Sequence, residues 1–426
     1  MEKFVIGGGK ALSGEVYISG AKNAAVAIIP STILADSPCT LENVPNIKDV
    51  EVMFEIMTKM GAKIEQTGKN TYYVDATGIE TTDVIFEEAG RMRASYYILG
   101  ALLAKKGKAC VRMPGGCFFG DRPMDQHIKG FSILGAECSF DDLKNCVSVF
   151  AKNGLKGGNI YMDVVSVGAT INVMIAAVTA EGTTVIENAA REPHIVDVAN
   201  FLNMMGANIK GAGTEVIKIK GVKELRGVNY SIIPDQIEAG TYIAAIAATH
   251  GKAVVKNVIP KHLDSIMVKI NEMGVKTSVG ENGDSISIDA SGELKSCKVK
   301  TTPHPGFPTD MQPQFVVLMS MAKGTSYMRE TVWECRFQYI EQLKRTGMDV
   351  KISGNKRDLL IIEGGKTLHG IDMQATDLRA GAAMIIAALC ANGVSTISNI
   401  NYIERGYDRI VEKLQALGAD IAKESC

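Results

Sequence analysis

One cysteine lies in a segment whose composition suits chemistry on a loop. Residues 112–123 read Arg-Met-Pro-Gly-Gly-Cys-Phe-Phe-Gly-Asp-Arg-Pro, and so many glycines and prolines exclude a helix or a central strand. The charge of Arg122 and the loop amides should stabilise the thiolate of Cys117, which would make this cysteine acidic and nucleophilic. The alternative is a surface turn with an incidental cysteine.

The scaffold that must position this loop is a repeat. Six times a helix-like stretch runs into a glycine, and these glycines lie 74, 71, 68, 73 and 71 residues apart. A fixed period of this size indicates one supersecondary unit copied six times. The six glycines are Gly61, Gly135, Gly206, Gly274, Gly347 and Gly418.

Each repeat has the pattern of a mixed α/β unit. Apolar residues before Gly61 recur every three or four positions, which predicts a helix that Gly61 ends with a left-handed cap. Residues 217–220 and 285–288 alternate in polarity, which predicts strands with one wet face. A second, more apolar helix is expected, as in 169–180 and 380–391. The unit is therefore two helices with a small sheet.

The two ends of the chain are out of phase with this repeat. The sequence stops soon after Gly418 without a second hairpin, whereas it opens with an orphan hairpin over residues 4–18. We therefore expect the N-terminal strands to complete the last repeat. This predicts two inside-out α/β barrel domains of three repeats each, residues 22–230 with the Cys117 loop and residues 1–21 with 231–426. The apolar helices should lie inside and the sheets outside.

Composition excludes several classes of protein. A formal net charge of −1 gives no overall field for nucleic acid or an anionic membrane, and we expect neither as a partner. The first residues do not form a signal peptide, and no apolar run approaches membrane-spanning length. Nine cysteines without Cys-x-x-Cys pairs fit free thiols in a reducing cytoplasm. We expect no cofactor and no metal ion.

Seven separated motifs, in order along the whole chain, carry a specific resemblance. They are Gly20-Ala21-Lys22-Asn23-Ala24, Met92-Arg93-Ala94-Ser95, Pro114-Gly115-Gly116-Cys117, Ser166-Val167-Gly168-Ala169-Thr170, Phe307-Pro308-Thr309-Asp310-Met311-Gln312, Ala375-Thr376-Asp377-Leu378-Arg379 and Arg405-Gly406-Tyr407. Together they resemble the UDP-N-acetylglucosamine 1-carboxyvinyltransferase (MurA) family of enolpyruvyl transferases. The resemblance implies two inside-out domains with the active site in the cleft between them.

The resemblance also implies a reaction. The family transfers the enolpyruvyl group of phosphoenolpyruvate to the 3-hydroxyl of UDP-N-acetylglucosamine, with release of phosphate, by addition and then elimination. This is the first committed step of peptidoglycan synthesis, which cell wall biogenesis, cell shape and cell division require. Two polyanionic substrates call for several cations, an acid and a base, and exclusion of water.

For phosphoenolpyruvate, the resemblance implies a phosphate clamp and a carboxylate clamp. Lys22 at a helix start, with Asn23 beside it, would meet the phosphate. The residues that complete the two clamps are Arg122 and Arg405 for the phosphate and Arg336 and Arg379 for the carboxylate. Taken singly, Lys22 would more often be a solvated surface lysine, and each arginine an exposed or ion-paired surface group.

For proton transfer, the resemblance implies two residues. Asp310, in a Pro-rich loop, would act on the sugar hydroxyl as a general base. The alternative is a helix N-cap before Met311, and one residue can have both roles. Cys117 would donate a proton, form a covalent phosphoenolpyruvate adduct and react with the epoxide fosfomycin. The division of proton-transfer roles between them stays open. Asp377 would orient Arg379.

For the sugar nucleotide, the resemblance implies residues of two helix starts and two loops. The diphosphate would meet backbone amides at the start of the 169–180 helix. The set is Arg93, Arg122, Pro123, Met124, Asp125, His127, Ser166, Val167, Gly168, Asp310 and Val332. His127 could instead be a plain helix-face histidine.

The chain departs from the family pattern at two places. The family often has a lysine where this chain reads Asp163-Val164-Val165-Ser166, and an arginine where it has Gln236. Each departure removes a cation. The first, which includes Val165, bears on nucleotide affinity, and the second on the region near the second domain crossing.

Three other functions compete with this interpretation. The shikimate-pathway enolpyruvyl transferase shares the repeat but has no need of the Cys117 loop or of a diphosphate site at Ser166. A non-catalytic UDP-sugar-binding paralogue would not need Lys22, Cys117 and Asp310 together. A thiol hydrolase would need a base beside Cys117. Phosphate release that depends on the sugar nucleotide would separate all of them. Oligomeric state stays open.

Overall fold

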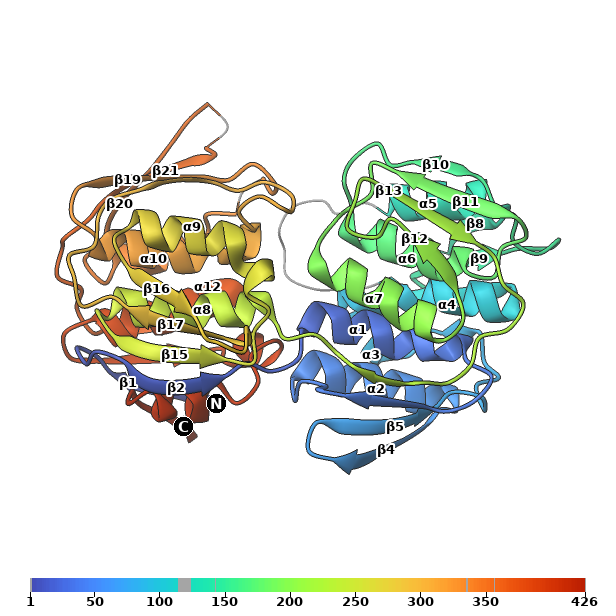
Figure 1. The fold of residues 1–426 in the computed structure, drawn as a ribbon, viewed down its shortest axis with the longest axis horizontal. Helices are drawn as coiled ribbons and strands as arrows, with labels where there is room; N and C mark the ends of the chain where they lie inside the picture. The colour runs from blue at the N-terminus through green and yellow to red at the C-terminus, as the bar shows by residue number, and fades with distance from the viewer. Residues whose placement is uncertain (1, 114–123, 142, 335, 356, 426) are drawn as a thin grey trace. The chain divides into compact units, whose positions relative to one another are not determined.

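The computed structural model describes residues 2–113, 124–141, 143–334, 336–355 and 357–425. The chain divides into two compact units (Figure 1). Unit 1 consists of Met1–Ser19 and Pro234–Cys426, and unit 2 of Gly20–Ile233. These limits lie two to three residues from the positions 22 and 230 expected from the repeat.

Hydrogen bonds at the first crossing explain this shift. The backbone N–H of Ser19 donates to Glu238 Oε2 at 2.8 Å, and its hydroxyl donates to Asp408 Oδ2 at 2.7 Å, so Ser19 is held inside unit 1. Two residues later, the N–H of Ala21 donates to the carbonyl of Ile233 at 2.7 Å inside unit 2. The chain therefore crosses between Ser19 and Ala21.

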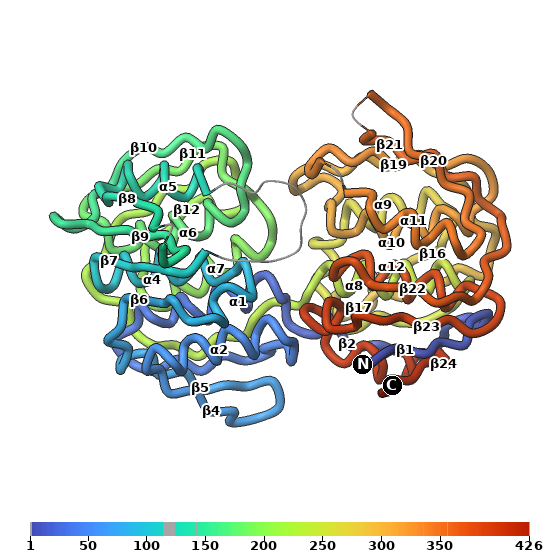
Figure 2. Tube along the Cα trace, turned by 180° about the vertical axis from the view of Figure 1, so that it is seen from behind, coloured from blue at the N-terminus to red at the C-terminus, as the bar shows by residue number. Residues whose placement is uncertain are grey.

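The described residues form six sheets of four strands, and all six have the same strand order. In each sheet the first two strands pair parallel and the other two pairs are antiparallel. The sheet β22-β23-β1-β24 shows how the repeat closes, because the N-terminal β1 lies between β23 and the C-terminal β24 (Figure 2). The prediction that the N-terminal strands complete the last repeat is therefore confirmed.

Unit 2 contains three of these sheets and seven α-helices among its described residues. Its strands are β14 (Asn229–Ser231), β3 (Cys39–Glu42), β5 (Thr71–Asp75) and β4 (Lys63–Gly68); β6 (Asp83–Val84), β7 (Lys108–Arg112), β9 (Cys146–Phe150) and β8 (Glu137–Asp141); β10 (Asn159–Tyr161), β11 (Thr183–Glu187), β13 (Val216–Lys220) and β12 (Asn208–Lys210). Its helices are α1 (Lys22–Ser31), α2 (Lys48–Met60), α3 (Glu87–Arg91), α4 (Tyr97–Lys106), α5 (Asp125–Ile133), α6 (Val167–Ala177) and α7 (Pro193–Met204).

Unit 1 repeats the arrangement. Its strands are β22 (Asp372–Gln374), β23 (Val394–Ser398), β1 (Glu2–Gly7) and β24 (Asp420–Ser425); β2 (Ser13–Tyr17), β15 (Lys252–Lys256), β17 (Ser285–Asp289) and β16 (Lys276–Val279); β18 (Lys298–Lys300), β19 (Thr325–Arg329), β21 (Leu359–Glu363) and β20 (Asp349–Ser353). Its helices are α8 (Gln236–Ala248), α9 (Asp264–Glu272), α10 (Gln312–Met321), α11 (Ile340–Lys344), α12 (Leu378–Cys390), α13 (Asn401–Glu404) and α14 (Ile410–Ala416).

The apolar helices are the interior of each unit, as the sequence predicts. In unit 1, α8, α10 and α12 pack on one another, and in unit 2, α4 packs on α1 and α6. Each unit has one continuous hydrophobic core. The strands alternate buried and exposed side chains, as in β13, so the sheets cover the helices with one face in solvent. The fold is thus an inside-out α/β architecture.

The repeat glycines end their helices as expected. All six have a positive φ, from 83° at Gly418 to 113° at Gly206, a conformation that residues with a Cβ adopt only with strain. The helix expected over 169–180 begins earlier, at Val167, because the Ser166 hydroxyl caps it by accepting from the N–H of Ala169 at 3.3 Å. This cap places the Ser166-Val167-Gly168 motif at a helix N-terminus.

Candidate active site

Asp310 lies between two buried guanidinium groups of unit 1. It sits in a 3₁₀ turn, Thr309–Met311, directly before α10. Its Oδ1 accepts from Arg336 Nη2 at 3.0 Å, and its Oδ2 from Arg379 Nε at 3.3 Å and Nη2 at 3.2 Å. The arginine side chains are only 4% and 5% exposed, whereas the Asp310 side chain is 32% exposed. The structure therefore brings three of the predicted site residues together around one open carboxylate.

The two cations control the charge of this carboxylate. Burial by itself would raise the pKa of Asp310, but the Arg379 and Arg336 guanidinium groups outweigh burial and hold the pKa well below its usual range. Asp310 is therefore an ionised acceptor at neutral pH. Removal of either arginine from it would raise its basicity.

The alternative role of Asp310 as a helix cap is wrong. The N-cap position of α10 is Met311, and no side chain caps this helix. The reason is that both carboxylate oxygens of Asp310 already accept from guanidinium N–H groups. An Asp before a helix start satisfied the sequence rule for a cap, but the buried arginines 26 and 69 residues away determine its orientation.

Glu330 supports this site and was missed by the sequence analysis. It is buried, and its Oε2 accepts from the Thr309 hydroxyl at 2.8 Å, while Thr309 Oγ1 accepts from Arg336 Nη1 at 2.5 Å. Its Oε1 accepts from the backbone N–H of Val332 at 2.8 Å. One buried carboxylate thus holds both Arg336 and the backbone at Val332. A lone Glu at the end of a strand gave no sequence signal for this role.

Arg379 is held by the start of its own helix and by an aromatic ring. Asp377 caps α12, because its Oδ1 accepts from the N–H of Arg379 at 2.8 Å and of Ala380 at 3.0 Å. The Arg379 guanidinium lies 5.5 Å from the centre of the Tyr407 ring, a cation–π distance. The Tyr407 hydroxyl in turn lies 3.0 Å from Thr241 Oγ1. Asp377 therefore acts on Arg379 through the backbone of the helix.

Arg405 and Tyr407 belong to the same short motif in unit 1. Arg405 is half-buried and follows α13 directly. Tyr407 is buried two residues later. The Arg-Gly-Tyr motif therefore provides the Arg405 guanidinium and also the Tyr407 ring that contacts the Arg379 guanidinium.

Lys22 is the first residue of α1 and forms an ion pair in unit 2. Its ammonium lies 2.7 Å from Asp49 Oδ2, and the two side chains are 12% and 8% exposed. The alternative of a solvated surface lysine is therefore wrong. Asn23 is half-buried beside it. Asp49, in the first turn of α2, is a second residue that the sequence analysis missed.

His127 is buried in α5, and its ring lies beside Gly168 at the start of α6. Asn172 accepts from the N–H of Gly100 through Oδ1 at 2.9 Å and donates through Nδ2 to the carbonyl of Tyr96 at 2.8 Å, which fixes the orientation of its amide. The same Nδ2 lies 3.0 Å from His127 Nδ1, so Nδ1 is the acceptor and we assign the proton to Nε2. Nε2 lies 3.2 Å from the position of a Cβ on Gly168.

The charge state of His127 agrees with this assignment. Burial, and then the positive charge of Arg93, lowers the pKa of His127 to about 3, so the ring is neutral at physiological pH. Arg93 itself lies 5.3 Å over the Tyr96 ring. His127 Nε2 therefore lies at the N-terminus of α6, and the positive charge of Arg93 acts on the same ring, an arrangement that favours an anion.

The remaining residues predicted for the sugar nucleotide include some that the structure describes and some that it does not. Met124 is buried and precedes α5, whose first residue is Asp125; Asp125 Oδ2 accepts from Gln126 Nε2 at 2.8 Å. Cys117, Arg122 and Pro123 lie outside the described residues. Val332 and Asp310 belong to unit 1, and the others to unit 2.

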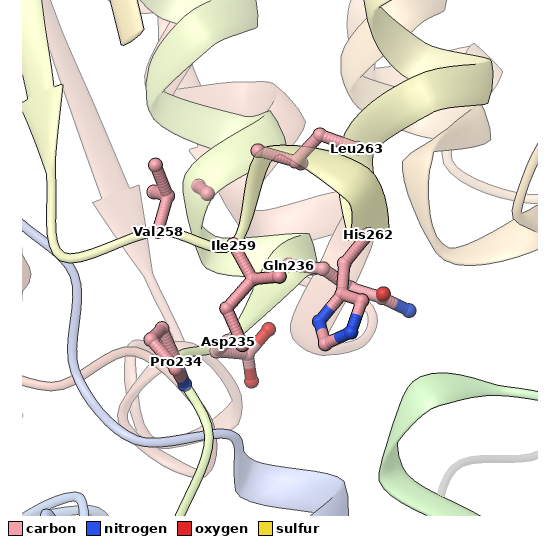
Figure 3. Close-up of a pocket in the computed structure, with 8 residues that line it drawn as sticks. Pro234, Asp235, Gln236, Val258, Ile259, His262 and Leu263 are labelled. Carbon is pink, nitrogen blue, oxygen red and sulfur yellow. The ribbon is translucent and has the colours of Figure 1, made fainter. Parts of the chain in front are cut away.

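The two departures from the family pattern lie at exposed and half-buried positions. Val165 is exposed, directly before Ser166. Gln236 begins α8 and lines a small pocket of unit 1 with His262 (Figure 3). Gln236 Oε1 and His262 Nδ1 are buried there with no hydrogen-bond partner among the described residues. The pocket at Gln236 therefore contains two buried polar atoms without a hydrogen-bond partner among the described residues.

A pH-dependent stability is expected from His127. Since its pKa is lowered from 6.5 to about 3 in the folded state, the unfolded chain binds the proton first as the pH falls. Its contribution to the free energy of unfolding is present above pH 6.5 and is lost toward pH 3, by up to about 1.4 kcal/mol per pH unit. In denaturant unfolding between pH 7.5 and 5, His127→Gln should lose stability less steeply than the unchanged protein. Parallel pH profiles would contradict the buried neutral ring.

The described residues offer neither a metal site nor a membrane-spanning helix. No group of three or more His, Cys, Asp or Glu side chains in the described part of the chain could hold a metal ion. No described helix is long and apolar enough to span a bilayer.

Comparison with known proteins shows the family of this chain. The family model described as EPSP synthase (3-phosphoshikimate 1-carboxyvinyltransferase) matches residues 6–414. The chain is 55% identical over 423 residues to UDP-N-acetylglucosamine 1-carboxyvinyltransferase 3 of Caldanaerobacter subterraneus subsp. tengcongensis, with 99% of each chain covered. This chain belongs to the UDP-N-acetylglucosamine 1-carboxyvinyltransferase family of enolpyruvyl transferases. A second UDP-N-acetylglucosamine 1-carboxyvinyltransferase, from Clostridium botulinum, is 52% identical and covers 99% of this chain and 100% of its own.

Solved structures of enolpyruvyl transferases share the fold. The enolpyruvyl transferase NikO from Streptomyces tendae superposes with a TM-score of 0.88 at 28% identity, covering 100% of this chain and 99% of its own. An EPSP synthase from Acinetobacter baumannii superposes with a TM-score of 0.76 over 100% of both chains, at 19% identity. That second likeness concerns the fold alone.

Proposed function

We propose that this chain transfers the enolpyruvyl group of phosphoenolpyruvate to the 3-hydroxyl of UDP-N-acetylglucosamine and releases phosphate. The observation that carries the proposal is Asp310, an ionised carboxylate between two buried guanidinium groups. Such a site binds a substrate carboxylate and provides a base next to it. Relatives named for this reaction, 50–55% identical along the whole chain, supply the choice of substrates.

Asp310 accepts hydrogen bonds from Arg336 and Arg379 that a substrate carboxylate could also accept. Phosphoenolpyruvate carries a carboxylate of the same shape, and guanidinium forks bind such groups bidentately. When the substrate carboxylate takes over these hydrogen bonds, Asp310 loses its two closest cations, and its pKa rises from the depressed value. Binding of the substrate would thus turn Asp310 from an ion-pair partner into a base.

The proposed chemistry has three proton transfers. The sugar hydroxyl gives its proton to Asp310 as its oxygen forms a bond to C2 of phosphoenolpyruvate, while Cys117 donates a proton to C3. In the second step C3 loses a proton and the C2–O bond to phosphate breaks, which restores the double bond. Asp310 or Cys117 takes the proton that C3 loses.

The other predicted residues take binding roles in this proposal. Lys22, Asn23, Arg122 and Arg405 bind the phosphate of phosphoenolpyruvate. The diphosphate of the sugar nucleotide binds at the start of α6, where His127 offers an N–H donor and Ser166 to Gly168 offer backbone amides. Arg93 adds a positive charge, and Val332 meets the sugar through its backbone.

The proposed cellular role follows from the reaction. An enolpyruvyl transfer to UDP-N-acetylglucosamine is the first committed step of peptidoglycan synthesis, and it takes place in the cytoplasm. The principal alternative is transfer to shikimate 3-phosphate, the reaction in the name of the matching family model. Identities of 50–55% to sugar-nucleotide enzymes favour the first acceptor.

A competition between acceptors tests the proposal. The purified protein is mixed with phosphoenolpyruvate, UDP-N-acetylglucosamine and shikimate 3-phosphate in one reaction, and products are identified by mass spectrometry. Enolpyruvyl-UDP-N-acetylglucosamine should be the product. Formation of the shikimate product instead, or of neither product, would refute the assignment of the acceptor.

Fosfomycin is expected to alkylate Cys117. Two competing thiols, Cys297 and Cys390, are poor nucleophiles, because burial raises the pKa of each to about 12. Peptide mapping should therefore find the adduct on Cys117. Cys117→Asp should retain some turnover and form no adduct, since an acid of similar reach still transfers a proton. Modification chiefly at Cys297 would contradict the role given to Cys117.

A further inference from the structure

Two cysteines lie on adjacent strands of one sheet in unit 2, outside the site described above. In the antiparallel pair of β7 and β9, Cys110 is opposite Ser148, and Cys146 is opposite Arg112. These four side chains alternate with Ala109, Val111, Val147 and Val149, which are all part of the buried core. Cys110 and Cys146 are therefore diagonal neighbours on the outer face of the same sheet.

The two sulfur atoms are in contact. Cys110 Sγ lies 2.7 Å from Cys146 Sγ. Cys110 is half-buried, whereas Cys146 is buried. Nearby Cys138 on β8 provides a contrast, because its Sγ contacts Ser132 Oγ and the carbonyl of Ala136.

From this contact we infer that Cys110 and Cys146 are a redox-active pair that closes to a reversible disulfide between β7 and β9 when a small-molecule disulfide is present. The Cys110 thiolate attacks one sulfur of oxidised glutathione, the S–S bond of glutathione breaks, and one glutathione thiolate leaves. The Cys146 thiolate then attacks the Cys110 sulfur, and the second glutathione leaves. The two protein thiols lose two protons and two electrons, which reduce the oxidised glutathione to two molecules of glutathione.

The groups around Cys146 determine the rate at which the disulfide forms. Burial, and then the hydrogen bond to Cys110, raises the pKa of Cys146 to about 11. The groups that face it are Cys110 and Arg112 on β7, Ser148 on its own strand and Asp141 on β8. Closure needs the Cys146 thiolate, so its rate should rise about tenfold from pH 7 to pH 8.

Peptide mapping tests this inference. The folded full-length protein is incubated with oxidised glutathione, free thiols are then blocked with iodoacetamide, and the peptides are identified without reduction. A peptide pair joined through Cys110 and Cys146 is expected, and dithiothreitol should restore both thiols. The experiment is repeated on Cys117→Ser, which should form the same bond because the inference does not involve Cys117. Enolpyruvyl transfer is not measured, so the result does not depend on the proposed function.

Two variants provide the controls. Cys146→Ser, a change of small volume, should keep glutathione on Cys110 as a mixed disulfide, because the second step is blocked. Cys138→Ser should form the Cys110–Cys146 bond at the rate of the unchanged protein. Persistent glutathione on Cys110 of the unchanged protein, free thiols at both positions, or a bond from Cys110 to another cysteine would each overturn the inference.

Discussion

Asp310→Asn is expected to lower turnover by about a hundredfold to ten-thousandfold, the range for loss of a general base. An amide keeps the shape of the carboxylate but takes no proton from the sugar hydroxyl. Affinity for phosphoenolpyruvate should stay the same or increase, because Asp310 no longer competes for Arg336 and Arg379. The measurements are kcat and the dissociation constants of both substrates.

The matched control for this variant is Asp358→Asn. Asp358 also accepts from an arginine, Arg329 Nη1 at 2.9 Å, but this pair is on the surface, with side chains 46% and 24% exposed for Arg329 and Asp358. Its loss should leave kcat unchanged. Near-normal turnover of Asp310→Asn would leave the catalytic base unassigned. A large loss of phosphoenolpyruvate affinity in Asp310→Asn would contradict the proposal that the substrate carboxylate replaces Asp310 at Arg336 and Arg379.

Arg379→Ala is expected to lower kcat/KM for phosphoenolpyruvate by about thirtyfold to several-thousandfold, which corresponds to about 2–5 kcal/mol for truncation of one partner of a buried charge pair. The variant loses a fork for the substrate carboxylate and also the cation that does most to lower the pKa of Asp310. With that cation gone, the pKa of Asp310 rises, so the acid limb of the pH profile should move to higher pH.

Arg329→Ala is the control for this second variant. It removes an arginine from an exposed ion pair of the same unit, so its kcat/KM should change by less than about fivefold, or about 1 kcal/mol. An acid limb that stays in place in Arg379→Ala would contradict the coupling between Arg379 and Asp310. Equal losses in both arginine variants would show a general effect of charge.

The repeat made the fold predictable from sequence. The six glycines have the positive φ that their position at helix ends requires, because glycine is the residue that adopts it without strain. The phase of the repeat also predicted that β1 pairs inside the last sheet. The glycine conformation is a local feature and the pairing of β1 follows from the period of the repeat. A single sequence contains the information for each.

The partners of the site residues were not predictable in this way. Lys22 pairs with Asp49, His127 with Asn172, and Arg336 is linked through Thr309 to Glu330. None of these pairs has a characteristic spacing, since each depends on how separate helices and strands pack. The alternative role of Asp310 as a helix cap failed for the same reason, because its oxygens accept from buried guanidinium groups and not from helix amides.

The rate of phosphate release from phosphoenolpyruvate, measured with and without UDP-N-acetylglucosamine, tests the proposed function most directly. Release is expected to depend on the sugar nucleotide, to saturate with it, and to yield one phosphate for each enolpyruvyl product formed. Equal release without the sugar nucleotide would contradict it, as would release that requires shikimate 3-phosphate instead.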